Sequence, residues 1–351
     1  MGTLPGDSSS HAVALNNRGQ VAGWGGSPGN PFFQFPWVWQ EGSLSALTLP
    51  LEGLTGDVQD INGHRQIIGQ TKQLIGDHQS RDDGSLKAVH VGPLGTMLGS
   101  KGNAPFLPFL VRDGRTEFFE HPEQGRVLLR AINNHGHVLG WLDTFYQEEP
   151  NRPPRKTRKS FLWRDGQFTD IAAQDGGKFQ AYGLNDLDQV VGTAVSPSGE
   201  HNSHAWLWQD GQLTDLGTLG GYSIPRAINL LGQIVGVSHT HNEGEEVPVH
   251  GFLWDSGILI NLDGTSGFQA SRPLAINNRG QIVGQLSIED GEDGPIFGFL
   301  WQAGQMHNLN ELVVPGSDWD ITEAIDINDM GQIACNAERD GASRALLLMP
   351  L

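Results

Sequence analysis

The segment Ile276-Asn277-Asn278-Arg279-Gly280-Gln281-Ile282 decides the fold, because seven versions of it occur along the 351-residue chain. Each version places an Asn directly after an apolar residue and closes on a second apolar residue. The seven versions cover residues 15–21, 61–67, 132–138, 184–190, 228–234, 276–282 and 327–333. Successive copies lie about 44 to about 71 residues apart, within or above the length of one supersecondary unit of a propeller or solenoid. The spacing therefore predicts a repeat protein.

A second recurring element is a short apolar and aromatic run between the Asn motifs. Its seven copies cover residues 37–39, 109–111, 161–163, 206–208, 252–254, 299–301 and 345–348. Six of these runs lead into a Gly, at Gly42, Gly114, Gly166, Gly211, Gly257 and Gly304. Glycine adopts the positive φ that tight hairpins need, so each of these turns is predicted to join two antiparallel strands.

One complete unit extends from Pro225 to Leu262, with strands expected at 226–229, 233–237, 250–254 and 258–262. These segments have high β-propensity, and no helical periodicity lies between them. Four short antiparallel strands make one blade, so the sequence predicts an all-β, seven-bladed β-propeller in a single domain, 1–351. The chain stops after the third strand of the seventh unit, so we expect that blade to be closed by, or to lack, a short N-terminal strand.

The composition restricts the partners and the location. Forty acidic and 22 basic residues give a net charge of -18, which opposes binding to nucleic acid or to an anionic membrane surface. Cys335 is the only cysteine, so no intrachain disulfide can form. No run approaches the ~20 apolar residues of a membrane span. Residues 1–7 lack a basic segment and an apolar run, which favours a cytoplasmic protein; a truncated start would instead allow an extracellular or periplasmic one.

Most recurring residues have a structural interpretation. The Asn of each unit is expected to hydrogen-bond its own turn, as Asx side chains do. The Trp that ends five of the apolar runs is expected to pack between neighbouring blades. Trp24, Trp141 and Trp319 lie outside that register and are better candidates for ligand contact, although a core position is favoured for them too. Cys335 occupies the position of Gly236 in its unit and is expected to be a small buried residue.

Three phrases of the chain resemble the HAF repeat family, named for a His-Ala-Phe tripeptide. They are residues 204–208, residues 215–221, and residues 227–229 followed by 232–236. The resemblance covers essentially the whole chain, but His-Ala becomes His250-Gly251 in one unit and the tripeptide is lost in units two, three and seven. Membership would imply a β-propeller often labelled extracellular, without an established common activity. No catalytic residue is carried over.

Length variation concentrates in the loops between the second and third strands, which all emerge on one face of a propeller. Insertions on one face usually mark the binding surface of a repeat protein. Two insertions stand out, a long loop at 71–108 in blade two and a basic loop at 143–159 in blade three. The predicted partner-binding residues in them are Arg152, Arg155, Lys156, Arg158, Lys159, Phe106 and Leu107. We therefore expect a non-catalytic binding or scaffold protein whose protein partner is acidic at the contact, with a solvated loop as the simpler interpretation of the basic segment.

Other classes of site have weaker support. His239, His241 and Glu243 form a ligand-rich loop without the fixed spacing of a zinc site, and Asp290 and Asp293 could hold a weak calcium ion without a full EF-hand loop. No other cofactor is expected, and no nucleophile elbow, His-Glu-x-x-His or P-loop motif occurs. The alternative function is a secreted carbohydrate-active or metal-dependent propeller enzyme, a hydrolase or lyase, that assembles carboxylates from separate blades. The sequence does not indicate the oligomeric state.

Overall fold

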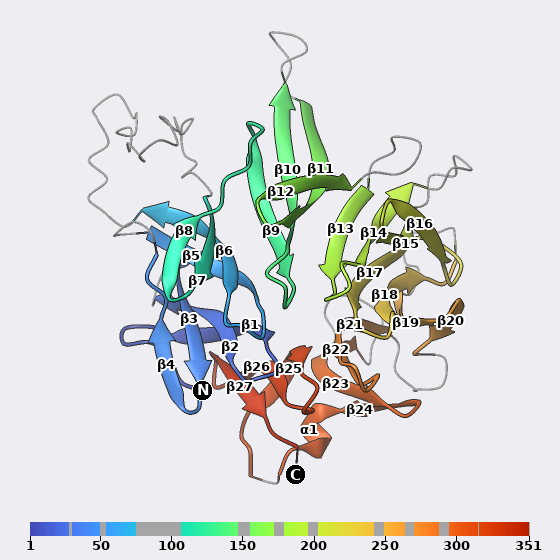
Figure 1. Cartoon of the computed structure of the whole chain (residues 1–351). Helices are drawn as coiled ribbons and strands as arrows, with labels where there is room; N and C mark the ends of the chain where they lie inside the picture. The colour runs from blue at the N-terminus through green and yellow to red at the C-terminus, as the bar shows by residue number, and fades with distance from the viewer. Residues whose placement is uncertain are drawn as a thin grey trace.

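A computed structural model of the chain describes residues 1–27, 30–49, 54–74, 107–146, 155–171, 179–195, 203–241, 249–263, 270–287, 295–314 and 316–350. Seven antiparallel sheets follow one another around a common axis, and six of them have four strands (Figure 1). Each sheet is a simple meander of consecutive strands. The predicted all-β, seven-bladed propeller is thus confirmed.

The strand bounds follow the repeats. Blades one and two comprise β1 (Ser9–Leu15), β2 (Val21–Ser27), β3 (Asn30–Gln40) and β4 (Ser43–Ala46), then β5 (Leu54–Ile61), β6 (Ile67–Leu74), β7 (Pro108–Arg112) and β8 (Arg115–Phe118). Blades three and four comprise β9 (Arg126–Ile132), β10 (Val138–Tyr146), β11 (Arg155–Arg164) and β12 (Gln167–Ile171), then β13 (Phe179–Leu184), β14 (Val190–Val195), β15 (Ser203–Gln209) and β16 (Gln212–Gly217).

The remaining blades have the same order. Blades five and six comprise β17 (Ser223–Ile228), β18 (Ile234–His239), β19 (Val249–Asp255) and β20 (Ile258–Asn261), then β21 (Ala270–Ile276), β22 (Ile282–Ser287), β23 (Ile296–Gln302) and β24 (Gln305–Asn308). The short helix α1 (Leu309–Leu312) leads into blade seven, which comprises β25 (Asp320–Ile327), β26 (Ile333–Arg339) and β27 (Ala342–Leu348). The first strand of each blade contacts the first strand of the next, so the first strands are innermost.

The hairpin between the third and fourth strands has the backbone that its glycine predicts. In blade four, Asp210 and Gly211 have φ values of 49° and 84°, and the corresponding pair in blade three, Asp165 and Gly166, has 47° and 89°. Two consecutive positive φ values define a type I′ turn, whose twist matches that of the flanking antiparallel strands. The Gly turns predicted from the sequence are therefore confirmed.

The hydrophobic core is divided into seven clusters, one between each pair of neighbouring blades. Between blades three and four, for example, Leu139 and Leu162 pack with Val190 and Trp208. The five Trp residues that end third strands all lie in or against such a cluster, as predicted. Because every blade buries both faces against its neighbours, a blade removed from the ring would expose two apolar surfaces.

Blade seven has three strands, and the N-terminal residues lie against its outer edge. The Met1 ammonium group donates a 3.0 Å hydrogen bond to the carbonyl of Ala345 on β27, and the Ala345 N–H donates to Ser10 Oγ at 3.1 Å. Met1 and Leu4 also pack against the cluster between blades seven and one. Figure 1 shows the N-terminus beside β27. The ring is thus closed without a regular fourth strand in that blade.

Candidate functional site

The repeated Asn residues form a closed ring of hydrogen bonds. Each is only 3–5% exposed, and each Nδ2 donates to the backbone carbonyl of the equivalent Asn in the next blade. The last bond, from Asn328 to Asn16 at 3.1 Å, joins blade seven to blade one. The predicted bond to the residue's own turn is also present, since Asn277 Oδ1 accepts from the N–H groups of Arg279 and Gln281 at 3.0 Å. The Asn residues therefore hold the ring together and do not form a ligand site.

Two carboxylates that sequence reasoning missed lie on innermost strands, two residues before the Asn of their blades. Burial raises the pKa of Asp60 to about 6, and burial together with the charge of Asp60 raises the pKa of Asp326 to about 7. The two residues belong to blades two and seven, so blade one separates them along the ring. They influence each other only across the space that the innermost strands enclose. Both side chains are half-buried, as expected for groups that face the axis of the ring.

The contacts of these carboxylates indicate a structural role. Asp60 accepts hydrogen bonds from the N–H groups of Ile61 and, in the next blade, Ile132 at 2.7 and 2.8 Å. Asp326 likewise accepts from Ile327 and, across the closure, from Leu15 at 2.8 and 2.7 Å. All four carboxylate oxygens therefore accept a hydrogen bond from a backbone N–H group. A raised pKa on the propeller axis is the kind of signal that marks catalytic acids, but here it accompanies bonds that link neighbouring blades.

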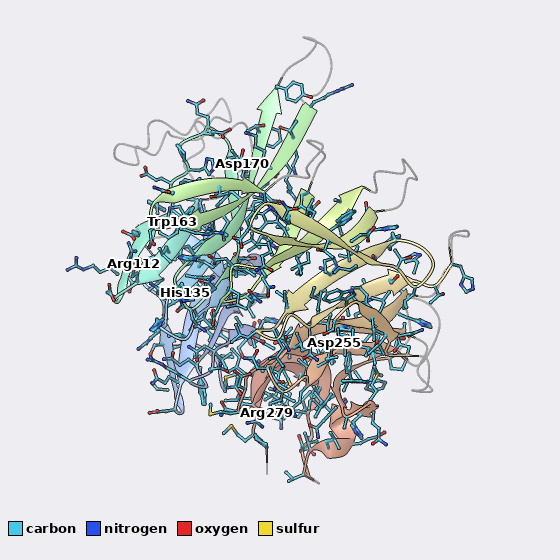
Figure 2. The ribbon with its side chains drawn as sticks, turned by 45° about the vertical axis from the view of Figure 1, so that its right-hand side comes forward. Arg112, His135, Trp163, Asp170, Asp255 and Arg279 are labelled. Atoms are coloured by element: carbon cyan, nitrogen blue, oxygen red, sulfur yellow. The ribbon has the colours of Figure 1, made fainter. Side chains whose placement is uncertain are left out.

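The described parts of the basic insertion of blade three, residues 143–146 and 155–159, are strand, whereas the sequence predicted a loop over 143–159. β10 and β11 pair with each other out to Tyr146 and Arg155. Their pairing with the flanking strands stops earlier, β10 with β9 at Asp143 and β11 with β12 at Ser160. Residues 144–146 and 155–159, here called the arm, thus form a two-stranded ribbon whose two edges have no ladder partner among the described residues. Figures 1 and 2 show it rising beyond the neighbouring strands.

Most cations of the arm have carboxylate partners within the same protein. Arg158 donates to both oxygens of Asp143 at 2.6 and 2.9 Å, and Lys156 lies 2.8 Å from the same carboxylate. Burial opposes ionisation of Asp143, but these two cations outweigh it and lower its pKa. Lys159 pairs with Glu123 at 3.1 Å, and Asp170, labelled near the base of the hairpin in Figure 2, lies 3.7 Å from it. The expected free basic patch is therefore mostly neutralised within the blade.

The end of the arm is aromatic, which the sequence analysis missed. Phe145 and Tyr146 are 58% and 43% exposed on β10, facing Lys156 and Arg155 in the strand register. Arg155 is itself exposed, and Arg152 lies outside the described residues. Their exposure could not be read from the sequence, because residues 138–146 show no apolar–polar alternation and the two aromatic residues are consecutive.

Of the two residues expected to bind a partner at the blade-two insertion, the structure describes Leu107, which is buried. Leu107 is 6% exposed, and its backbone pairs with Thr71: the Thr71 N–H donates to the Leu107 carbonyl at 2.8 Å and the Leu107 N–H to Thr71 Oγ1 at 2.9 Å. Its side chain belongs to the interior because it directly precedes β7, whose side chains fill the core. Phe106 and residues 75–106 of the insertion lie outside the described part of the chain.

The three tryptophans outside the repeat register each pack against a ring or a cation. Trp24 stacks on His11 at 4.1 Å, and Arg339 lies 4.5 Å from the ring of Trp319. Trp141 is 8% exposed and donates its Nε1 hydrogen bond to the Ala181 carbonyl at 2.8 Å. Trp141 is thus a core residue, consistent with the favoured interpretation.

The described metal candidates do not converge on one another. The ring of His239 packs against that of Tyr222 with the centroids 3.8 Å apart, and His241 Nδ1 lies 2.9 Å from Thr240 Oγ1. Within the described ranges, no group of three His, Cys, Asp or Glu side chains could hold a metal ion. Glu243, Asp290 and Asp293 fall outside those ranges. Over the same ranges, no helix has the length and apolarity needed to cross a membrane.

Comparison with known proteins identifies the fold. No family model matches the sequence, so the resemblance to the HAF repeat family stays a prediction, and no curated protein matches it. The structure is similar to the orthorhombic form of Pyrococcus horikoshii acylaminoacyl peptidase, with a TM-score of 0.54 and 12% identity over 94% of this chain and 50% of that one. It is also similar to an acylaminoacyl peptidase in complex with Z-Gly-Gly-Phe-chloromethyl ketone, with a TM-score of 0.54 and 13% identity over 94% of this chain and 50% of that one. The chain spans about half the length of these proteins, and the likeness shows the propeller fold alone.

Proposed function

We propose that this propeller is a non-catalytic binding or scaffold protein that engages a protein partner through the arm of blade three. The observation that supports the proposal is the arm itself: a ribbon beyond the blade, with unpaired outer edges and two exposed aromatic side chains, Phe145 and Tyr146. A strand edge without a ladder partner is a template for an added strand, and natural proteins usually shorten, bend or cover such edges. In blade three, β10 and β11 instead extend beyond their neighbouring strands and leave these edges unpaired.

The chemistry of the arm favours a partner that adds a strand to its edge. An added strand would gain main-chain hydrogen bonds along β10 or β11, while its side chains would contact Phe145 and Tyr146. Large aromatic residues are enriched among the few interface residues that dominate binding energy. Arg155 and Lys156 are both exposed on the arm, and their charge favours a partner that is acidic beside this contact, since charge complementarity orients an encounter more than it adds affinity. Because Lys156, Arg158 and Lys159 already have carboxylate partners, the aromatic pair contributes more than the cations.

The test uses two double variants of the tagged full chain. In the first, Phe145→Ser and Tyr146→Ser remove the aromatic tip. In the matched control, Leu187→Ser and Leu231→Ser remove two apolar side chains that are 59% and 68% exposed in the Asn turns of blades four and five. Each protein is used to capture partners from its own organism, and the affinity of a captured partner is then measured with purified components.

The expected result is a partner that binds wild type and control equally but binds the arm variant at least about tenfold more weakly, because a hot-spot aromatic contributes about 2 kcal/mol or more. A third variant, Arg155→Ser, is expected to slow association with a smaller effect on affinity. Equal binding of wild type and arm variant, or a loss confined to the control, would overturn the proposal.

A further inference from the structure

Every innermost strand carries one extra residue at the same place, three positions before the Asn of its blade. The pairing of first and second strands skips this residue in all seven blades. The extra residues are Val13, Gln59, Arg130, Tyr182, Arg226, Leu274 and Ile325. The residue directly before each of them is buried, whereas the extra residue itself is half-buried or exposed. A bulge re-aims one side chain out of the regular alternation.

Two of these bulge residues are arginines that share one space. Arg130 belongs to blade three and Arg226 to blade five, so blade four lies between them. Burial lowers the pKa of Arg130, and the charge of Arg226 adds to the effect. Tyr182, the bulge residue of blade four, lies between the two: the Arg226 guanidinium is 6.0 Å from its ring, and its ring is 6.0 Å from that of Trp141. The Arg130 guanidinium in turn lies 4.7 Å from the Trp141 ring.

Neither arginine has a counter-charge in the part of the chain that the structure describes. Within the described ranges, Arg130 and Arg226 form no ion pair, and Arg130 Nε is buried without a hydrogen-bond partner. Arg158, which lies 4.1 Å from the same Trp141 ring, shows the contrast, because both oxygens of Asp143 bind it. The protein has 40 acidic residues and 22 basic ones, so most of its cations could find a carboxylate partner. Two neighbouring arginines without such a partner are therefore unexpected. A partly buried charge is costly unless it is paired.

We propose that Arg130 and Arg226, together with Tyr182, form a binding site for a small oxyanion, a carboxylate or a phosphate group, on the axis of the propeller. A guanidinium presents its N–H groups as a planar fork that matches the oxygens of either anion, and two such groups can bind one anion from two sides. The Tyr182 hydroxyl supplies a further donor. The anion neutralises the pair and provides the acceptor that Arg130 Nε lacks. This site is separate from the arm and does not depend on the function proposed for it.

The experiment measures binding of inorganic phosphate and of succinate to the full-length protein by isothermal titration calorimetry, with chloride at matched ionic strength as the reference. The variants are Arg130→Gln and Arg226→Gln. The matched control is Arg112→Gln, which removes an exposed arginine at the end of β7 in blade two, labelled in Figure 2. Arg226 is exposed, so its replacement leaves the core intact, and circular dichroism of each variant verifies the fold.

Saturable binding of one anion is expected for wild type and Arg112→Gln, with an affinity at least about tenfold lower in each axial variant, because a charged hydrogen bond contributes about 1.5 to 3 kcal/mol. Binding of phosphate alone assigns a phosphate ligand, and binding of succinate alone a carboxylate ligand. No saturable binding of either anion at millimolar concentration overturns the proposal, as does equal binding by wild type and both axial variants.

Discussion

Replacing one Asn of the ring tests how much a single link contributes to the stability of the whole propeller. Asn277 is 4% exposed and makes four hydrogen bonds with its side chain. Nδ2 donates to Gln281 Oε1 at 2.7 Å and to the Asn328 carbonyl at 3.0 Å, while Oδ1 accepts from the N–H groups of Arg279 and Gln281 at 3.0 Å. Asn277→Ala removes all four and leaves the Gln281 N–H group without its acceptor.

The expected loss of stability follows from the four hydrogen bonds that Asn277→Ala removes. At about 1 kcal/mol net for each hydrogen bond, the variant loses about 4 kcal/mol of unfolding free energy. The Asn328 carbonyl keeps its bond from the Gly331 N–H, which limits the penalty there. Urea denaturation followed by tryptophan fluorescence measures the change. The control, Arg279→Ala, alters an exposed side chain of the same turn and is expected to stay within about 0.5 kcal/mol of wild type. A loss for Asn277→Ala no larger than that of the control would refute the structural role of the ring.

Three further predictions concern packing, pH and thiol chemistry. A Cβ at Gly140 would overlap Phe161 Cζ, so Gly140→Ala should lower the unfolding free energy by about 1 to 3 kcal/mol in urea denaturation, and Phe161→Leu in the same chain should recover part of it. Burial raises the pKa of Asp326 to about 7 and that of Asp60 to about 6, above the ordinary 3.8. The folded chain therefore holds protons that the unfolded chain releases, so the unfolding free energy should fall as pH rises from about 4 to about 7, by at most about 1.4 kcal/mol per pH unit for each carboxyl. Asp326→Asn should flatten that slope, and an unchanged slope would contradict the assignment. Cys335 is buried and burial raises the pKa of its thiol, so a disulfide reagent should react with it only as fast as the protein unfolds. Immediate labelling of the native protein would contradict its burial.

The blade could be predicted because its signals are local. A hairpin glycine such as Gly211 and the Asn before each inner turn act within a few residues, so their spacing defines the strands. The burial of Cys335 followed from its register alone. The link from each Asn to the next blade could not be predicted, because it requires the neighbouring blade to be in place. The same reason explains why the roles of Asp60 and Asp326 were missed.

The arm shows why the candidate site was harder to predict. Charged residues and Pro153-Pro154 are typical of a loop, and β-propensity gives little reason to expect a strand at 155–159. The strand forms because β10 and β11 continue their pairing beyond the blade, which brings Asp143 opposite Arg158. Cross-strand contacts depend on register, and register is set by the whole blade. Three of the predicted cations thus have carboxylate partners within the protein, and their predicted role in partner binding stays a prediction.

Hydrogen–deuterium exchange on the full chain, free and saturated with a captured partner, tests the proposed function most directly. The account predicts that partner binding slows exchange of the backbone amides in residues 144–146 and 155–159, where the ladder edges are open. Exchange in the Asn turns that contain Leu187 and Leu231 should stay the same. Protection confined to those turns, with the arm exchanging at its free rate, would contradict the account.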